Sequence, residues 1–366
     1  MRVLHVVGSM NRGGIESFLM NVYRNIERSK LQFDFAVHTK DKCAFDDEIE
    51  ALGGKIYRIT PRNKSIIQNN KDWDNLFKTH SDINVVHQHV SSLTYVSPLR
   101  IAKKNGVQNC IVHSHNIQAE SRLHYVFHLL NSRYIDKYAN YYFACSNNAA
   151  KWLYGKSKVK SNNIQLVKNA INIENFLFQN DKRCDFRSNL SLNEGEIVIG
   201  HVGRFSEQKN HKFLIDIFEK ISEKVKNAKL LLVGIGSLEK DIKYYVKEKK
   251  LDSNVMFLGN RSDVANIMQA MDIFLLPSLH EGLPLVLVEA QASGLMCFVS
   301  SEAVSNEAKI TETYKSISLE KNAEHWSNEI IKSLYYKRKD TSVFVRKAGY
   351  EIKNEALNLQ NFYLNL

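Results

Sequence analysis

Residues 277–294 read PSLHEGLPLVLVEAQASG, and this stretch holds the most specific pattern in the chain. It directly follows an apolar run at 272–276 that has the composition of a buried strand. Pro284 suits the first position of a helix, where its missing N–H costs no hydrogen bond. The free N–H groups of Leu285 and Val286 then point, with the positive end of the helix dipole, beyond the end of the strand. The stretch therefore predicts a strand, a loop and a helix that form a seat for a phosphate group.

Two glutamates flank this predicted phosphate seat. Glu289 lies between one and two turns into the expected helix, where a carboxylate can accept hydrogen bonds from a ribose. Glu281 lies in the preceding loop and can reach a different part of the same ligand. The alternative is a capped core helix with two incidental glutamates, which is the usual explanation of such a spacing taken alone.

Residues 200–212 read GHVGRFSEQKNHK and predict a second strand end followed by a helix. Arg204 and Lys209 lie five residues apart at the carboxyl edge of that strand, where parallel sheets bind anions. A planar guanidinium and a lysine ammonium can together neutralise a diphosphate leaving group without a metal ion. Ordinary surface charge is the alternative.

Short apolar runs alternate with helical patterns along both halves of the chain, which indicates βαβ units and parallel sheets. The expected strands are 2–8, 33–38, 56–59, 84–90, 109–113, 141–145, 196–203, 229–234, 254–258, 272–276 and 296–300. The expected helices are 15–27, 72–80, 92–105, 120–138, 209–226, 237–250, 262–270, 284–293 and 322–337. The fold class is therefore α/β, with two Rossmann-like, doubly wound parallel-sheet domains that face a cleft.

The domain boundary is expected where sustained periodicity is lost. Residues 169–194 are rich in Asn and Asp and are interpreted as a linker between a domain at 1–168 and a domain at 195–340. Residues 341–366 are expected to form one C-terminal helix that packs across both domains.

Composition excludes several classes of protein. The 366 residues contain no apolar run of the roughly 18 to 20 residues that a membrane span needs, and Met1 leads directly into a strand pattern, so we expect a cytoplasmic protein without a signal peptide. The five cysteines are scattered without metal-ligand spacing, so we expect reduced core residues and no metal site.

The net charge of +11 is distributed unevenly along the chain. Residues 1–168 hold 24 Lys and Arg against 13 Asp and Glu, whereas residues 169–366 hold 26 of each kind. This asymmetry favours an anionic partner for the first half, and a solvated basic face is the alternative.

The pattern E-G-x-P-x-x-x-x-E at 281–289 resembles the donor-site signature of retaining GT-B glycosyltransferases of the family 4 type, the glycosyl transferases group 1, as found in capsule and exopolysaccharide biosynthesis. Residues 203–209 are similar to the G-R-x-x-x-x-K-G pattern of that family, with Asn210 in place of the last glycine. The resemblance implies that Glu281 contacts and positions the donor sugar and that Glu289 binds the nucleotide ribose.

The resemblance assigns further residues to the two sides of the cleft. In the first half it implies that the loop with Gly13 and Gly14 borders the donor phosphates, although a plain strand-to-helix turn is an alternative. In the second half it implies that Gly259 and Arg261 lie at the edge that binds the nucleotide base, through backbone groups. The donor site then consists of Gly13, Gly14, Arg204, Lys209, Gly259, Arg261, Leu285, Val286 and Glu289.

A histidine completes the predicted catalytic group. The resemblance places His115, after the strand at 109–113, facing the donor sugar near the reacting centre, together with Glu281, Arg204 and Lys209. His87 and His89 end another strand and are candidates to line an acceptor pocket. Without a third ligand at suitable spacing, they do not predict a metal site.

Residues 122–135 are apolar on nearly all sides and rich in aromatic residues, and four lysines follow between 151 and 160. This combination suits contact with an anionic membrane face. A buried core helix explains the apolar part equally well.

We therefore expect a retaining, metal-independent glycosyltransferase that needs no cofactor. It moves a sugar from a nucleotide-sugar, with a UDP-sugar favoured, to a polyprenyl-diphosphate-linked saccharide at the inner face of the plasma membrane. The alternatives are a nucleotide-sugar epimerase of the same fold and a catalytically idle partner subunit. A nucleic-acid-binding module would explain the basic half, but no recognised binding motif supports it.

Overall fold

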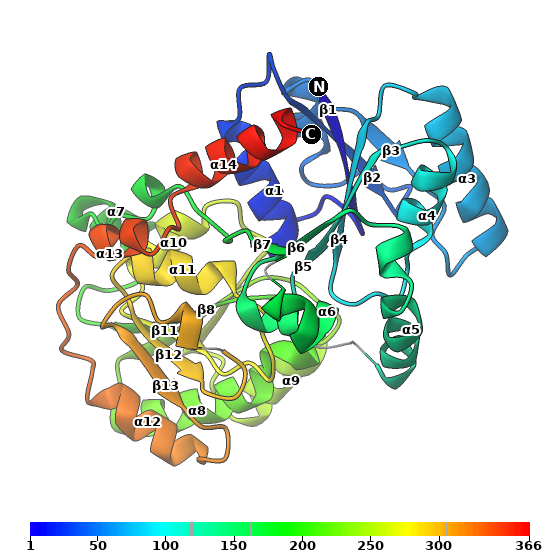
Figure 1. The fold of residues 1–366 in the computed structure, drawn as a ribbon. Helices are drawn as coiled ribbons and strands as arrows, with labels where there is room; N and C mark the ends of the chain where they lie inside the picture. Colours follow the sequence, from blue (N-terminus) through cyan, green and yellow to red (C-terminus); the bar gives the residue numbers. More distant parts are fainter. Residues whose placement is uncertain (118–120, 162, 305) are drawn as a thin grey trace. The chain divides into compact units, whose positions relative to one another are not determined.

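A computed structural model describes residues 1–117, 121–161, 163–304 and 306–366. The chain divides into two compact units (Figure 1). Unit 1 comprises residues 1–170 together with 352–366, and unit 2 comprises residues 171–351. The division therefore differs from the expected domain limits at both ends of the second domain.

Unit 1 contains a sheet of seven strands in the order β3-β2-β1-β4-β5-β6-β7, and all of its strand pairs are parallel. Its strands are β1 (Arg2–Val7), β2 (Gln32–Val37), β3 (Ile56–Arg58), β4 (Val85–Val90), β5 (Asn109–Ser114), β6 (Tyr141–Ala144) and β7 (Ile164–Leu166). Its helices are α1 (Gly14–Asn25), α2 (Asp46–Ala51), α3 (Ile66–Thr79), α4 (Ser97–Lys104), α5 (Arg122–Ser132), α6 (Asn147–Lys160) and α14 (Ile352–Leu364).

Two apolar cores cover the two faces of this sheet. On one face Phe18 of α1 and Tyr363 of α14 pack with alternate residues of the strands, such as Val3 and Phe33. On the other face helices α3, α4 and α6 supply the core, with Trp73 as its largest fully buried side chain. Because both faces are buried, the central strands are continuous apolar runs interrupted by a few polar residues.

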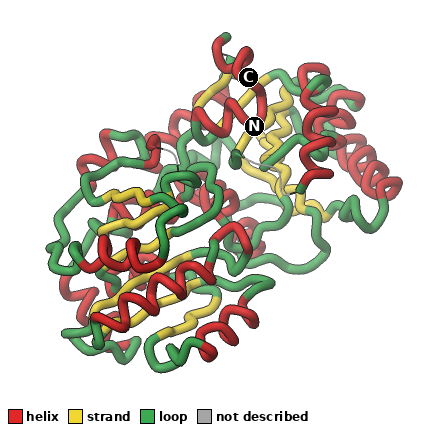
Figure 2. The backbone as a smooth tube through the Cα atoms, turned by 90° about the horizontal axis from the view of Figure 1, so that it is seen from below, coloured by secondary structure: helices red, strands yellow, loops and turns green. Residues whose placement is uncertain are grey.

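Unit 2 contains six strands in the order β10-β9-β8-β11-β12-β13, again with only parallel pairs, and helices border the sheet (Figure 2). Its strands are β8 (Ile197–Val202), β9 (Ala228–Val233), β10 (Val255–Gly259), β11 (Ile273–Leu276), β12 (Met296–Ser300) and β13 (Tyr314–Ile317). Its helices are α7 (Asn180–Asn189), α8 (His211–Lys224), α9 (Glu239–Glu248), α10 (Val264–Ala270), α11 (Leu285–Ala292), α12 (Ala323–Ile331) and α13 (Ser342–Lys347).

All the expected strands are present, and the strands that were not expected are the edge strands β7 and β13. Both are short and carry exposed polar residues, so their composition does not distinguish them from loops. Helices α2, α6 and α7 were not expected either. Gly155 interrupts α6 at a φ of 80°, which explains its weak helical pattern.

The segment expected as a linker, 169–194, belongs largely to unit 2. It contains α7, which packs on α10. Arg183 holds α7 to the end of α10 through an ion pair with Asp272 at 2.5 Å. The sequence did not reveal this helix, because its few apolar residues give no clear period.

The single C-terminal helix expected at 341–366 is wrong, because two helices are present. Helix α13 ends at a glycine in the left-handed region, Gly349 with a φ of 81°. Tyr350 N–H then donates to Val345 C=O at 3.1 Å, closing the end of the helix. Helix α14 follows and packs against α1 within unit 1, so the chain passes between the units twice.

One further expectation on composition needs correction. Cys43, Cys110, Cys145 and Cys297 are free and buried, as expected of reduced core residues, whereas Cys184 is free but exposed.

Candidate active site

The expected anion site of unit 2 lies where the strand order reverses. β8 and β11 are neighbours in the sheet. The strand that follows β8, which is β9, lies on one side of this pair, and the strand that follows β11, which is β12, lies on the other side. Ligands of open parallel sheets bind beyond the carboxyl ends of the strands at such a point. Arg204 and Lys209 follow β8, and Glu281 and α11 follow β11.

Lys209 and Glu281 form the centre of this site. Lys209 Nζ lies 2.5 Å from Glu281 Oε1, and their side chains are 14% and 6% exposed. A neighbouring amide supports the pair, because Gln208 Nε2 donates to His280 C=O at 2.9 Å and to Glu281 Oε2 at 3.3 Å. A desolvated ion pair is stable only with such additional hydrogen bonds, so the geometry holds Glu281 in one orientation.

Arg204 differs from Lys209 in its surroundings. Its side chain is exposed at the end of β8, and it makes no ion pair with another residue in the described ranges. The guanidinium is therefore available to an incoming anion, whereas Lys209 already has a carboxylate partner.

Asn210 explains the departure from the glycine of the family pattern. Its backbone is left-handed, with a φ of 54° and a ψ of 46°. Asparagine tolerates this conformation better than most residues with a side chain, which is why it can replace glycine. Asn210 Nδ2 also donates to Pro277 C=O at 3.1 Å, so it ties the loop after β8 to the end of β11.

Helix α11 begins one residue later than expected. Pro284 is the residue that caps the helix, with a φ of −69° and an extended ψ of 115°, and Leu285 is the first helical residue. The prediction that Pro284 occupies the first helical position is therefore wrong by one residue. Leu285 and Val286 are nevertheless the first two residues, whose N–H groups have no acceptor inside the helix. The first intrahelical donor is Leu287, which bonds Pro284 C=O at 3.0 Å.

Glu289 projects from the second turn of α11. Its side chain keeps part of its surface accessible, and its carboxylate has no hydrogen-bond partner among the described residues. Burial raises the pKa of Glu289 to about 7. An unpaired, largely desolvated carboxyl group at this position is suited to accept a hydrogen bond from a hydroxyl group of a ligand.

Gly259 and Arg261 lie two strands away from β8, at the end of β10. Gly259 has a φ of 66°, and its C=O accepts from Gly234 N–H at 2.8 Å. Arg261 forms a two-pronged ion pair with Asp263, at 2.7 and 2.6 Å, which raises the pKa of its guanidinium. Its side chain is thus engaged, so the backbone is the part of Arg261 that remains open to a ligand.

The candidate residues of unit 1 gather at the carboxyl edge of the other sheet. Gly13 and Gly14 open helix α1 after the loop that follows β1. A Cβ atom at Gly13 would meet the carboxylate of Glu16 at 2.4 Å, whereas one at Gly14 would meet nothing within 4 Å. His115 follows β5, and its ring lies 6.4 Å from that of Phe18 in α1.

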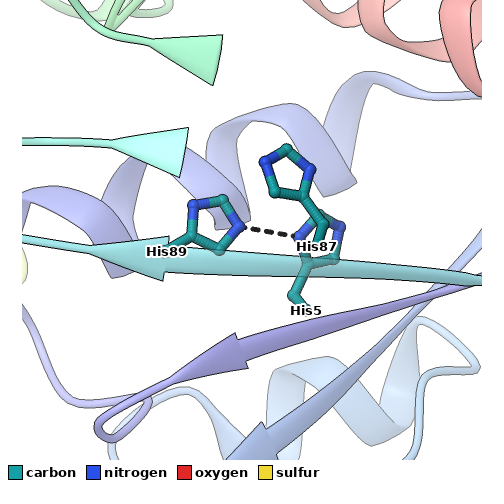
Figure 3. Close-up of side chains that lie close together, drawn as sticks. All are labelled: His5, His87 and His89. Atoms are coloured by element: carbon teal, nitrogen blue, oxygen red, sulfur yellow. Dashed lines mark hydrogen bonds between the residues drawn. The ribbon is translucent and has the colours of Figure 1, made fainter. Parts of the chain in front are cut away.

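Five histidines from three neighbouring strands lie on the face of this sheet that α1 and α14 cover. They are His5, His87, His89, His113 and His115. Figure 3 shows three of them, with the hydrogen bond of 3.0 Å between His5 Nδ1 and His89 Nε2. His87 Nδ1 lies 2.6 Å from the hydroxyl of Tyr363 in α14.

The prediction that His87 and His89 line an acceptor pocket is wrong for His87. Its side chain is 1% exposed, because α14 covers that face of the sheet. No third histidine was expected near this pair from the sequence spacing, but in the fold His5 of β1 lies next to it. Two groups of three, His5-His87-His89 and His89-His113-His115, each hold nitrogen atoms within 4.8 Å of one another.

Both halves of the chain match known protein families. Residues 182–348 match the model of glycosyl transferases group 1, and residues 12–175 match the model of glycosyltransferase family 4. EpsF of Bacillus subtilis (strain 168), which is named as a glycosyltransferase, is 32% identical over 99% of this chain and 96% of its own length. The chain belongs to the family 4 glycosyltransferases.

Two other relatives have more specific names. The UDP-Gal:alpha-D-GlcNAc-diphosphoundecaprenol alpha-1,3-galactosyltransferase of Escherichia coli is 31% identical over 74% of this chain and 72% of its own length. The capsular polysaccharide biosynthesis glycosyltransferase CapH of Staphylococcus aureus is 24% identical over 100% of this chain and 99% of its own length.

The fold of the glycosyltransferase agrees with this assignment. Anabaena Alr3699/HepE, solved in complex with UDP and glucose, matches it with a TM-score of 0.82 at 17% identity over the full length of both chains. Two Rossmann-like parallel-sheet units form the GT-B fold, so the predicted fold class is confirmed.

Helix α5 of the glycosyltransferase is not a core helix, so that alternative is wrong. Only His128 of α5 is buried, and Asn131 Nδ2 ties the same side of the helix to Leu93 C=O at 2.7 Å. The opposite side is an exposed apolar stripe with helical spacing, formed by Leu123, Val126, Phe127, Leu130 and the following Tyr134. Over the described ranges, no helix has the length and apolarity to span a bilayer.

Proposed function

We propose that this glycosyltransferase moves a sugar from a UDP-sugar to a saccharide acceptor, with retention of configuration and without a metal ion or cofactor. The observation that carries the proposal is the group at the switch point of unit 2. There an exposed Arg204, the Lys209–Glu281 pair and the first N–H groups of α11 lie at the ends of adjacent strands. Cationic and dipolar groups of this kind stabilise the charge that develops on a departing diphosphate.

In this mechanism the bond from the anomeric carbon to the diphosphate oxygen breaks, and a bond from the same carbon to the acceptor oxygen forms on the same face. The acceptor hydroxyl gives its proton to an oxygen of the departing phosphate. Arg204, Lys209 and the N–H groups of Leu285 and Val286 stabilise the leaving group. Glu281 positions the donor sugar, because its orientation is fixed by Lys209 and Gln208.

The remaining predicted residues take binding roles. Glu289 accepts from the ribose hydroxyls, and the backbone at Gly259 and Arg261 borders the base. Gly13 and Gly14 allow the backbone at the start of α1 to approach the donor phosphates, and His115 contacts the donor sugar. The UDP part of the proposal is supported by the UDP named with the Escherichia coli relative and with the Anabaena structure.

For the acceptor we propose a polyprenyl-diphosphate-linked saccharide in the synthesis of a capsule or exopolysaccharide. The names of the Escherichia coli and Staphylococcus aureus relatives support this class. The excess of basic residues in 1–168 favours an anionic acceptor and membrane surface as well.

Helix α5 is the proposed point of contact with the inner face of the plasma membrane. Its exposed apolar stripe would enter the interfacial layer, and exposed cations border it at Arg122, Arg133 and Lys137. Lys151 and Lys156 of the adjoining α6 are exposed as well. Apolar side chains beside a polybasic surface bind anionic bilayers by burial and charge together.

A nucleotide-binding experiment in EDTA tests the donor site. UDP, GDP and ADP, and then their sugars, are added to the protein, and the unfolding midpoint is recorded for the native protein and for Glu289→Ala. We expect UDP to raise the midpoint of the native protein and to lose most of this effect in the variant. If no nucleotide stabilises the native protein, the donor site is refuted and the idle-subunit alternative gains support.

A transfer assay separates the remaining alternatives. With a lipid-linked saccharide present, a transferase extends the lipid and releases UDP. An epimerase changes the nucleotide-sugar without any acceptor, and an idle subunit does neither. Analysis of the anomeric configuration of the product decides whether it is retained.

Vesicle co-sedimentation tests the membrane contact. Leu123→Ser/Leu130→Ser should lose most binding to vesicles rich in anionic lipid, and salt should weaken the binding of the native protein. The matched control is Leu357→Ser/Leu364→Ser, which changes two exposed leucines of α14. Equal binding by both variants would refute α5 as the contact.

A further inference from the structure

A chain of hydrogen-bonded histidines crosses the sheet of unit 1 and ends at His115. His5 Nδ1 lies 3.0 Å from His89 Nε2, and His89 Nδ1 lies 2.8 Å from His115 Nε2. In the strand register His5 pairs with His87, and His89 pairs with His113. Each hydrogen bond therefore joins a histidine to the residue two positions after its register partner on the next strand. The row of three histidines runs diagonally across the sheet toward the carboxyl ends of the strands.

All three rings of this chain are neutral near pH 7. Burial lowers the pKa of His5 and of His115 to about 3, and burial together with the other histidines places the pKa of His89 well below its ordinary value. A neutral imidazole carries one N–H, so three rings carry three N–H groups. The two bonds use two of them, and the third must lie at one of the two ends.

The two ends of the chain are not equivalent. At the inner end, His5 Nε2 is buried and has no hydrogen-bond partner within the described part of the chain. At the outer end, His115 is partly exposed, and its Nδ1 is not among the buried unpartnered atoms. An N–H at His5 Nε2 would be buried without an acceptor, which costs its desolvation free energy, whereas an N–H at the partly exposed His115 can reach solvent or a ligand. The third N–H therefore belongs at His115 Nδ1.

We propose that His5 and His89 are positioning residues that hold His115 in its neutral Nδ1–H form, so that His115 presents a hydrogen-bond donor to an oxygen of its ligand. The direction of the chain is His5 Nδ1–H to His89 Nε2 and His89 Nδ1–H to His115 Nε2. The proposal rests on the proposed function only in naming the ligand, which is a hydroxyl of the donor sugar. In this form His115 is a fixed donor, and it cannot act as a general base through Nδ1.

The spacing of the nitrogen atoms favours a shared proton over a shared metal ion. Tetrahedral ligation by imidazoles at about 2.0–2.1 Å from zinc separates the ligand atoms by about 3.3 Å. The separations of 3.0 and 2.8 Å lie in the range of N–H···N hydrogen bonds, and both nitrogen atoms of His89 are already used. A metal ion would have to replace the proton between His5 and His89.

Long-range ¹H–¹⁵N correlation spectra of the histidine rings, recorded at pH 7.5 on the full-length protein, test the proposal. Single His→Gln variants assign the signals. We expect the Nδ1–H tautomer at His5, His89 and His115 in the native protein. An Nε2–H tautomer at His115 would overturn the proposal, as would an equimolar transition metal that purifies with the protein and occupies these rings.

A pair of matched variants tests the direction of the effect. His5→Phe keeps an aromatic ring but removes the first donor, so His115 should become a mixture of tautomers. His113→Phe changes an equally buried histidine of the same face, whose two ring nitrogens have no partner among the described residues, and should leave His115 unchanged. An unchanged His115 tautomer in His5→Phe refutes the proposal.

Activity provides a separate readout. With equal populations of the two tautomers, half of the free enzyme presents the Nδ1–H donor, so His5→Phe should lower kcat/KM for the donor about twofold, through a higher KM, relative to His113→Phe. An equal kcat/KM for the donor in the two variants would contradict the proposed role. If no transferase activity is found, the proposed function fails while the tautomers still decide the state of His115.

Discussion

At the scale of single residues, the Lys209–Glu281 pair is the most sensitive point of the donor site. Lys209→Ala should lower kcat/KM by roughly 10²–10³-fold, because a cation that stabilises the leaving group is lost. It should also lower the free energy of unfolding by about 3–5 kcal/mol, because Glu281 is left buried without its partner. Steady-state kinetics and chemical denaturation measure the two effects.

Two comparisons separate catalysis from stability at this pair. Lys209→Met/Glu281→Gln should recover most of the stability but none of the activity, since no uncompensated charge remains buried. Lys212→Ala, an exposed lysine three residues away, should change neither quantity. Recovery of activity in the double variant would contradict the assigned roles.

Glu289 predicts a pH dependence of stability. Its pKa is raised by burial from an ordinary value of 4.5 to about 7. Between these values the folded state keeps a proton that the unfolded state has lost, so the contribution of Glu289 to stability falls as pH rises through this window. Glutamine cannot lose a proton, so the free energy of unfolding of Glu289→Gln should be higher than that of the native protein by about 1–3 kcal/mol at pH 8, but not at pH 4.5. Parallel curves of the unfolding midpoint against pH for the two proteins would contradict this.

At the scale of elements, the histidine face of the unit 1 sheet predicts acid lability. Burial lowers the pKa of His5 to about 3 and the pKa of His87, His89 and His113 well below the ordinary 6.5. Below pH 6.5 the unfolded state binds protons that the folded state does not, so stability is full above this pH and is lost as pH falls. Thermal melts between pH 7.5 and 4.5 should show a steep decrease of the midpoint.

His113→Leu should reduce the number of protons taken up on unfolding in acid by about one, which lowers the pH slope of the free energy of unfolding. It should not destabilise the protein at pH 7.5. Both ring nitrogens of His113 are buried and have no hydrogen-bond partner in the described part of the chain, so an apolar side chain of similar size removes a desolvation cost. A loss of more than about 2 kcal/mol at pH 7.5 would show that His113 has a hydrogen-bonding role.

At the scale of the whole molecule, the way in which each unit is distributed along the sequence predicts which fragment folds alone. Unit 2 is the continuous segment 171–351 with its own sheet and core. Unit 1 needs α14, because Ile352, Leu359 and Tyr363 belong to its core. The fragment 171–351 should therefore melt cooperatively and bind UDP.

The fragment 1–170 should lack a cooperative transition until residues 352–366 are supplied as a peptide. Circular dichroism melts of the three samples measure this. A fragment 1–170 that melts as sharply without the peptide would show that α14 is dispensable.

The sequence by itself determined the alternation of strands and helices, because apolar runs at β1, β8 and β11 must be buried on both faces of a parallel sheet. It also placed Arg204, Lys209, Glu281 and the start of α11 beyond strand ends, since each follows a strand within nine residues. These are local relations, and local relations can be read from spacing.

Only the tertiary structure decided which distant residues meet. It paired Lys209 with Glu281, and it brought together His5 and His89, which are 84 residues apart in the sequence. It divided residues 341–366 between two units and exposed the apolar stripe of α5. Burial and pairing depend on which element covers which face, and that choice depends on contacts of long sequence separation that no local pattern encodes.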